Sequence, residues 1–195
     1  GLREPSMEPT LAPTAPPGLL YSHADVLTFD GTESTVVDLS TRLSCVQGNN
    51  PRTIMFTVKG TSGTPISTGT ATNTGLAFNI RLLFGGYVGV MGFNKDVYPD
   101  SSTFVGDGEW HQVKVTWDTA TLRIYIDGVH AISTQTTSNG GAAYATIGNN
   151  NFLGKNNHIS THDYFTGELK EVSFWDVVIG DCSPGFTSND SGLTC

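Results

Sequence analysis

The feature that most constrains this chain is a pair of alternating runs within residues 107–128, DGEWHQVKVTWDTATLRIYIDG. Bulky, mostly apolar side chains recur there at every second position, at His111, Val113, Val115, Trp117, Leu122, Ile124 and Ile126. Successive side chains of a strand point to opposite faces, so this period predicts two strands that share one buried face. Asp127-Gly128 then predicts a tight turn, because glycine accepts the positive φ that other residues resist.

Short runs of the same kind continue along most of the chain, separated by glycine and polar clusters. They are VLTF, TVVDL, TIMFTVK, GLAFNIRLLF, YVGVMGF, WHQVKVTW, LRIYIDG, VHAIST, AAYATIG and YFTGELKEVSFW. The 23 glycines and the many Ser, Thr and Asn residues favour strands and turns over helices. About ten strands in one domain predict an all-β sandwich or closed barrel, because each bare edge would otherwise invite pairing with another chain.

The two ends of the chain differ in composition from this middle part. Residues 1–18, GLREPSMEPTLAPTAPPG, hold most of the prolines and predict an extended linker without a core. Residues 19–180 form the expected domain. Residues 181–195 form a short tail rich in Gly, Ser and Asn, which begins a cysteine-rich repeat or ends the chain.

The three cysteines, Cys45, Cys182 and Cys195, indicate neither a closed disulfide scaffold nor a zinc site with paired spacing. Cys182 and Cys195 are expected to close a small loop in an oxidising compartment, or else Cys195 pairs outside this chain. Cys45 is either a buried thiol or a distant partner of Cys182. The sequon Asn189-Asp190-Ser191 agrees with an extracellular setting. We therefore expect a secreted protein or the outer face of a membrane-anchored one.

The charge balance limits the partners. With 10 basic and 18 acidic residues, the formal net charge of -8 opposes binding to phosphate backbones, which needs clustered Lys and Arg. No run of 18 apolar residues occurs, so no segment is predicted to span a membrane. Nucleic acid and direct membrane insertion are thus not expected, whereas cation binding would fit the sign of the charge.

Four phrases occur in order from about residue 25 to residue 180. They are LTFDGTESTVVDL, WHQVKVTWD, LRIYIDG with the later ATIGNN, and YFTGELKEVSFWDVVI. In this order they resemble the laminin G-like domains of the concanavalin A-like jelly-roll superfamily, in the branch close to pentraxins. The resemblance implies a two-sheet antiparallel jelly-roll sandwich whose first and last strands lie side by side. It also makes Trp110 and His111 marks of the fold, and no serine or cysteine motif indicates a nucleophile for His111 to activate.

Members of this family mostly bind rather than catalyse. The resemblance therefore implies a non-catalytic extracellular binding or adhesion module that recognises a glycan or a cell-surface protein through rim loops, often with calcium. The tail CSPGFTSNDSGLTC also resembles the cysteine-rich repeats of large modular surface proteins of protists, including apicomplexan types used in host-cell adhesion. A structural spacer in such a protein is the first alternative function.

A polysaccharide-cleaving enzyme is the second alternative, because glucanases and lyases share the jelly roll. A retaining glycosidase needs two carboxylates about 5 Å apart, which a strand provides at alternate positions. The nearest pair, Glu168 and Glu171, is spaced three residues apart and so points to opposite faces of a strand. We therefore expect no enzymatic activity.

Calcium takes six to eight oxygen ligands, and two groups of acidic residues are candidates. The resemblance places a structural ion between Asp30 and the closing strand, where Lys170 stands in place of a usual aspartate and Glu171 remains. A second candidate is a rim site of Asp96, Asp100 and Asp107 in loops rich in glycine and serine. The alternative for both groups is solvated turn aspartates.

The stretch GNNNFLGKNNHISTHDYF, residues 148–165, is dense in amides. Its candidate glycan contacts are Asn149, Asn150, Asn151, Phe152, Asn156, Asn157 and His158. Amides both donate and accept hydrogen bonds, as sugar hydroxyls require, and an aromatic ring such as Phe152 or Tyr164 can stack on a pyranose. Asn also tolerates left-handed turn conformations, so the alternative is turn chemistry.

Overall fold

The computed structural model describes residues 16–43, 48–70, 76–92, 95–135, 144–147, 150–157 and 163–179. Its strands are β1 (Leu19–His23), β2 (Leu27–Asp30), β3 (Val37–Asp38), β4 (Arg52–Gly69), β5 (Ala77–Leu83), β6 (Tyr87–Met91), β7 (His111–Trp117), β8 (Thr121–Ile126), β9 (Val129–Gln135), β10 (Phe152–Leu153) and β11 (Thr166–Trp175). Two short 3-10 helices, η1 (Glu33–Thr35) and η2 (Ser101–Thr103), complete the described elements. The predicted all-β class is confirmed.

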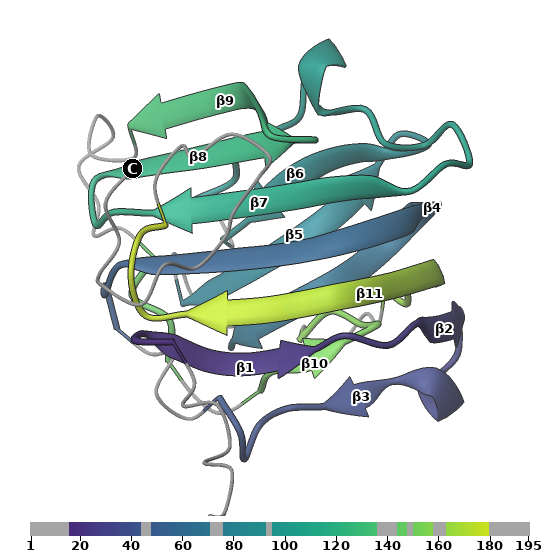
Figure 1. The fold of residues 1–195 in the computed structure, drawn as a ribbon, viewed down its shortest axis with the longest axis horizontal. Helices are drawn as coiled ribbons and strands as arrows, with labels where there is room; N and C mark the ends of the chain where they lie inside the picture. The colour runs from purple at the N-terminus through teal and green to yellow at the C-terminus, as the bar shows by residue number, and fades with distance from the viewer. Residues whose placement is uncertain are drawn as a thin grey trace, which may run out of the picture.

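The strands form two antiparallel layers (Figure 1). The front sheet has the order β1-β11-β4-β7-β8-β9, with β2 also paired to β11. The rear sheet contains β3, β10, β5 and β6, joined through β4. The long strand β4 belongs to both, since its first half pairs with β7 and β11 and its second half with β5 and β10. This arrangement confirms the predicted jelly-roll sandwich, including the pairing of the first strand with the last.

Gly63 marks the point where β4 passes from the front sheet to the rear sheet. Its φ is +96°, and a Cβ at this position would lie 2.1 Å from the backbone oxygen of Tyr164. Only glycine combines this left-handed conformation with so close an approach of another backbone. The crossing therefore brings the segment just before β11 against the middle of β4.

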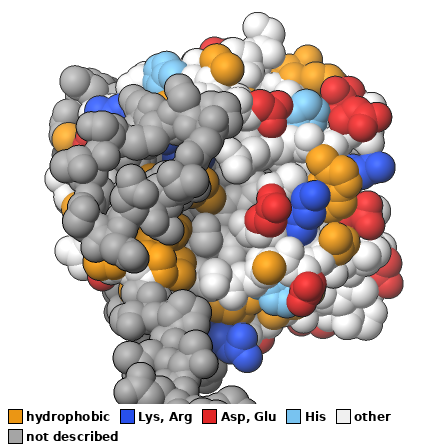
Figure 2. Space-filling view, in the orientation of Figure 1, with side chains coloured by type: hydrophobic (Ala, Val, Ile, Leu, Met, Phe, Trp, Pro, Cys, Tyr) orange, Lys and Arg blue, Asp and Glu red, His pale blue; other side chains and the backbone are white. Residues whose placement is uncertain are grey.

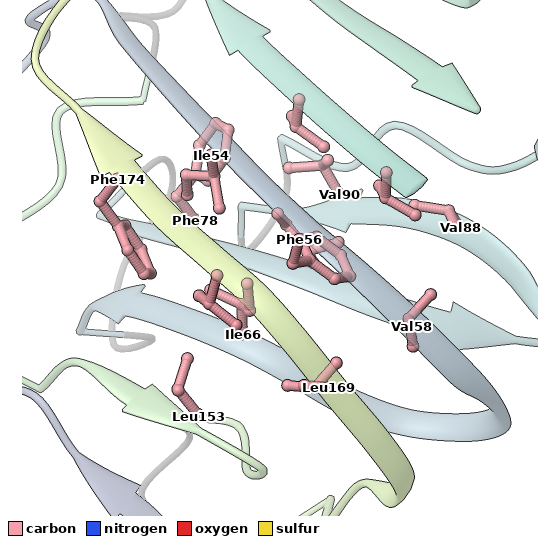
Figure 3. Packing of buried hydrophobic residues seen from close by; sticks show 14 of the residues in the cluster. Ile54, Phe56, Val58, Ile66, Phe78, Val88, Val90, Leu153, Leu169 and Phe174 are labelled. Atoms are coloured by element: carbon pink, nitrogen blue, oxygen red, sulfur yellow. The ribbon is translucent and has the colours of Figure 1, made fainter. Parts of the chain in front are cut away.

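The hydrophobic core fills the space between the sheets. Figure 3 shows Ile54, Phe56 and Val58 of β4 facing Phe78, Val88 and Val90 of the rear sheet. The predicted alternation of β7 and β8 holds here, because Val113, Val115 and Trp117 pair with Ile126, Ile124 and Leu122 and all six are buried.

His111 lies at the edge of this core and has a structural position. Its Nδ1 lies 2.7 Å from Oδ2 of Asp127, and its Nε2 lies 3.0 Å from Oδ1 of Asp107. The imidazole thus joins the start of β7 to the β8–β9 turn, where Asp127 has a φ of 50° and Gly128 a φ of 78°. The turn predicted from Asp127-Gly128 is present, and the aspartate shares the left-handed conformation expected of the glycine.

Most of the predicted linker 1–18, the whole tail 181–195, and Cys45 lie outside the described residues, so the domain boundaries and the disulfide alternatives stay predictions. Among the helices that the structure describes, none is long and apolar enough to cross a membrane.

Candidate functional site

The predicted amide cluster is largely used inside the fold. Asn149 and His158 lie outside the described residues. Asn151 is buried, with Nδ2 donating to the Leu43 carbonyl and Oδ1 accepting from the Gly69 N–H. Asn157 is buried as well, and its Nδ2 donates to the carbonyls of Thr68 and Gly69 at the end of β4.

The neighbours of these amides follow the same pattern. The Oδ1 of Asn156 accepts from the backbone N–H of Asp163, so it closes the segment on itself. The exposed Asn150 donates to the Thr70 hydroxyl, and the Phe152 ring lies 4.3 Å from the ammonium of Lys155. Ligand contact by these side chains therefore stays a prediction, and so does the alternative of turn chemistry.

The structure does not bring Asp30 and Glu171 together. Asp30 pairs with Thr166 at the start of β11, and Glu171 lies five residues further along that strand, a separation of roughly 16 Å. The Thr32 hydroxyl and the other hydrogen bonds to Asp30 hold the pKa of its carboxyl below the usual value. Glu171 accepts from the Thr57 hydroxyl at 2.7 Å, in a bulge where its own φ is 52°.

The aspartates predicted as rim ligands likewise form hydrogen bonds within their own turns. Asp96, Asp100 and Asp107 each accept a hydrogen bond from a nearby backbone N–H, at Gly92, Ser102 and Glu109 respectively. No three His, Cys, Asp or Glu side chains gather as a metal group among the residues described. Calcium binding therefore stays a prediction without a ligand set.

A different group of side chains converges on the outer face of the rear sheet. In β5, Phe78, Ile80 and Leu82 point into the core, so the alternation turns Asn79 and Arg81 outward. The guanidinium of Arg81 meets Oδ2 of Asp163, with Nη2 at 2.8 Å and Nε at 3.1 Å.

Asp163 is held in place from β4 as well. Its Oδ2 also accepts from the Thr64 hydroxyl at 2.8 Å. The side chains of Arg81 and Asp163 are 32% and 33% exposed, so the pair is open to solvent although it is anchored on both sides.

A buried amide lies beside this ion pair. Asn79 donates from Nδ2 to Oδ1 of Asn157 at 2.9 Å, and its own Oδ1 is buried without a partner within the described part of the chain. Buried polar groups are normally hydrogen-bonded, so an ordered water is expected to complete this one.

Aromatic rings bound the same face at its other end. Tyr87 of β6 lies opposite Leu83, and its ring centroid is 4.9 Å from that of Phe104, which is 40% exposed. We call the group of Thr64, Asn79, Arg81, Tyr87, Phe104 and Asp163 the rear-sheet site. It combines charge-assisted hydrogen-bond donors with aromatic surface, the two contacts that a sugar ring uses.

The arginine of this site has donors to spare. A guanidinium carries five N–H groups in a fixed planar fork. Within the described residues the Asp163 contact uses Nε and Nη2, along one edge of the plane. The edge formed by Nη1 and Nη2 is suited to a second carboxylate in bidentate geometry.

The outer face of the front sheet has a different character. Figure 2 shows acidic, basic and hydrophobic side chains interspersed over the part of this face that is not covered by grey atoms. Two of its lysines lie over aromatic rings, Lys114 at 4.0 Å from the Tyr125 centroid and Lys170 at 4.7 Å from that of Trp110. These two ammonium groups make cation–π contacts within the fold, so they contribute to its packing.

A protein-family comparison agrees with this architecture. A laminin G family model, described as the concanavalin A-like lectin/glucanases superfamily, matches residues 30–182. The chain belongs to this superfamily. The resemblance found from the four phrases is thereby confirmed for the domain. The comparison with curated proteins finds no significant match to this concanavalin A-like chain.

Solved structures resemble the domain in fold. The CBM40 of the Ruminococcus gnavus IT-sialidase, bound to α2,3 sialyllactose, has a TM-score of 0.66 and 17% identity over 84% of this chain and 96% of its own. A leech intramolecular trans-sialidase, complexed with 2,7-anhydro-Neu5Ac, has a TM-score of 0.65 and 16% identity over 92% of this chain. This chain spans only 30% of the leech enzyme.

A pentraxin is also similar. The native heptameric SAP-like pentraxin from Limulus polyphemus has a TM-score of 0.56 and 14% identity over 82% of this chain and 79% of its own. It shares the fold of this domain. At these identities the likenesses show the shared fold, and the ligand must be argued from the site.

Proposed function

We propose that this domain is a glycan-binding module that recognises a carboxylate-bearing terminal sugar, such as a sialic acid, at the rear-sheet site. The observation that carries the proposal is Arg81, whose guanidinium is fixed by Asp163 through Nε and Nη2 and whose side chain is 32% exposed. The sialyllactose complex of the similar CBM40 supports the choice of ligand class. Two of the predicted amides contact this site, because Asn157 accepts from Asn79 and Asn156 accepts from the backbone N–H of Asp163.

A ligand with one carboxylate and a polyanionic ligand need different binding sites. The net charge of -8 opposes sulfated polysaccharides, because such ligands need many neutralising cations. A single sialic acid needs one oriented guanidinium and neutral donors around it. The rear-sheet site meets this demand without a basic patch.

The proposed module binds without catalysis and acts outside the cell. Sialidases are among the similar structures, and the match covers 96% of the separate CBM40 and 30% of the leech enzyme. Incubation with 3′-sialyllactose, followed by assay of released sialic acid, tests this part. Any turnover above buffer would contradict it.

Calorimetric titration with 3′-sialyllactose and with lactose tests the binding proposal. We expect saturable binding of the sialylated sugar only. Arg81→Gln is expected to weaken it at least about tenfold, because a charge-assisted bidentate contact is lost. Equal binding of both sugars, or unchanged affinity in the variant, would overturn the proposal.

The matched control is Arg123→Gln. Arg123 forms an exposed pair with Asp118 at 2.7 Å on the front sheet, and its side chain is also 32% exposed. This variant removes an equivalent ion pair and should leave the affinity unchanged. All titrations are run with calcium and with EGTA, so that any calcium dependence is seen as a difference between the two series.

A further inference from the structure

Phe84 combines an unfavourable backbone conformation with an exposed aromatic side chain. It lies in the β5–β6 turn with a φ of 52°, and its side chain is 79% exposed. Bulky residues rarely adopt the left-handed region, and a phenylalanine in water gains nothing from burial. The next two residues are Gly85 and Gly86, with φ values of 88° and 124°. Glycine or asparagine would suit position 84 better, so the aromatic ring is unexplained by folding.

The turn is nevertheless well ordered by backbone contacts. The Gly86 N–H donates to the Leu83 carbonyl at 3.0 Å, and the Gly86 carbonyl accepts from Val105 at 2.8 Å. A Cβ at Gly86 would lie 2.3 Å from the Gly106 Cα, so the turn and this segment touch backbone to backbone. The ring of Phe84 is therefore presented from a firmly supported turn.

The position of Phe84 relates it to the rear-sheet site. Arg81 lies three residues before it on β5, a distance of roughly 10 Å along the strand. The Tyr87 and Phe104 rings lie at the same end of the rear sheet as the turn. The exposed side chains thus change from charged at Arg81 to aromatic at Phe84 over about the length of a disaccharide.

We propose that Phe84, together with Phe104, forms an outer subsite that packs against the apolar face of the second sugar, a neutral hexose, when Arg81 binds the acidic terminal sugar. This inference rests on the proposed function and extends it from a terminal monosaccharide to a disaccharide. The hexose ring covers the exposed phenylalanine, and this contact offsets the unfavourable backbone at position 84. The module therefore distinguishes sialylated glycans by the sugar that precedes the sialic acid.

The experiment compares two probes on three proteins. The probes are 3′-sialyllactose and the methyl α-glycoside of sialic acid, which lacks the hexose. The proteins are the wild type, Phe84→Asn and Phe84→Trp, each also followed by thermal unfolding. Asparagine tolerates the left-handed conformation, so this variant removes the ring without adding strain.

We expect Phe84→Asn to keep or raise the Tm, to weaken 3′-sialyllactose about tenfold, and to leave the methyl glycoside unchanged. Phe84→Trp should retain the affinity for 3′-sialyllactose. A fall in Tm with equal losses for both probes would assign Phe84 a structural role and overturn the inference. Unchanged 3′-sialyllactose affinity in Phe84→Asn would also overturn it, and would leave the ring to a protein partner.

The two proposals fail in different ways. If the wild type binds neither probe, the proposed function is wrong and the subsite with it. If the wild type binds both probes equally well and Arg81→Gln abolishes both, the function stands and only the subsite is wrong.

Discussion

Arg52 and Arg81 lie on paired strands and use the same side chain in opposite ways. Arg52 begins β4 and is 2% exposed, and burial lowers its pKa to about 10. Its guanidinium donates to oxygens of the neighbouring segments, those of Gly48, Asn50, Tyr144 and Thr146. Arg81 instead pairs with one carboxylate and keeps a third of its side chain in solvent.

The contrast separates a structural arginine from one available to a ligand. Arg52 connects β4 to Gly48 and to residues 144–146, and its plane lies 5.5 Å from the Phe78 ring in the core. Its N–H groups are used in holding distant parts of the chain together. Arg81 is oriented by Asp163 through Nε and Nη2, and its side chain stays 32% exposed. A recognition residue must be held in one orientation while some of its hydrogen-bond donors stay unpaired.

Arg52→Met is expected to give the largest effect and tests one side of this comparison. The change leaves buried carbonyls and a hydroxyl without a donor, which we expect to cost about 3 kcal/mol of unfolding free energy. In a domain of this size the Tm should fall by roughly 6–12 °C. Circular dichroism on heating measures it. A Tm close to that of the wild type would show that Arg52 is not structural.

Arg81→Gln and Arg123→Gln test the other side of this comparison, the arginine that is partly exposed. Both remove an exposed ion pair of nearly equal length, 2.8 and 2.7 Å, so each should cost less than about 1 kcal/mol. Urea unfolding of both variants should therefore give midpoints near the wild type. A large loss in Arg81→Gln alone would place Arg81 with Arg52 as a structural residue, and the binding result would then need another variant.

The smallest expected effect concerns His111 and pH. Partial burial lowers its pKa, but the hydrogen bonds of Asp127 and Asp107 outweigh burial and raise the pKa above 6.5. The added stability is full below the unfolded value near 6.5 and is lost as the pH rises through the higher folded value. We expect less than about 1 kcal/mol, because both carboxylates are solvent-exposed.

The Tm of the wild type should thus fall slightly between pH 6 and pH 8. His111→Gln should lose this part of the pH dependence, and thermal melts of both proteins across that range measure the difference. The opposite slope in the wild type would mean that burial dominates the histidine. A large slope would indicate that titrating groups other than His111 control stability.

The alternating pattern of residues 111–126 illustrates what was predictable. Its six apolar inward positions are buried in β7 and β8, whereas His111 is half-buried at the edge, and its turn falls at Asp127-Gly128. These features follow from the period of two and from local turn chemistry, which depend on neighbours in sequence. The same is true of Arg123 and Asp118, which lie five residues apart and close their own turn.

The rear-sheet site was not predicted, although one of its signals was present. Arg81 lies in the run GLAFNIRLLF, where the alternation already turns it away from the apolar side. Its partner Asp163 is 82 residues away in sequence, and no periodicity indicates that they meet. The density of amides in residues 148–165 is plain from the sequence, but density does not tell whether an amide bonds to a ligand or, like Asn157, to the edge of a strand.

The sequence by itself therefore determined the all-β class, the superfamily, and which side of each long strand faces the core, because all of these depend on local periodicity and on phrases in order. Only the tertiary structure decided which outward groups meet. The crossing of β4 at Gly63 carries the segment before β11 onto the rear sheet, so that Asp163 reaches Thr64 and Arg81. Contacts between such distant residues depend on topology and backbone clearance, which local pattern does not encode.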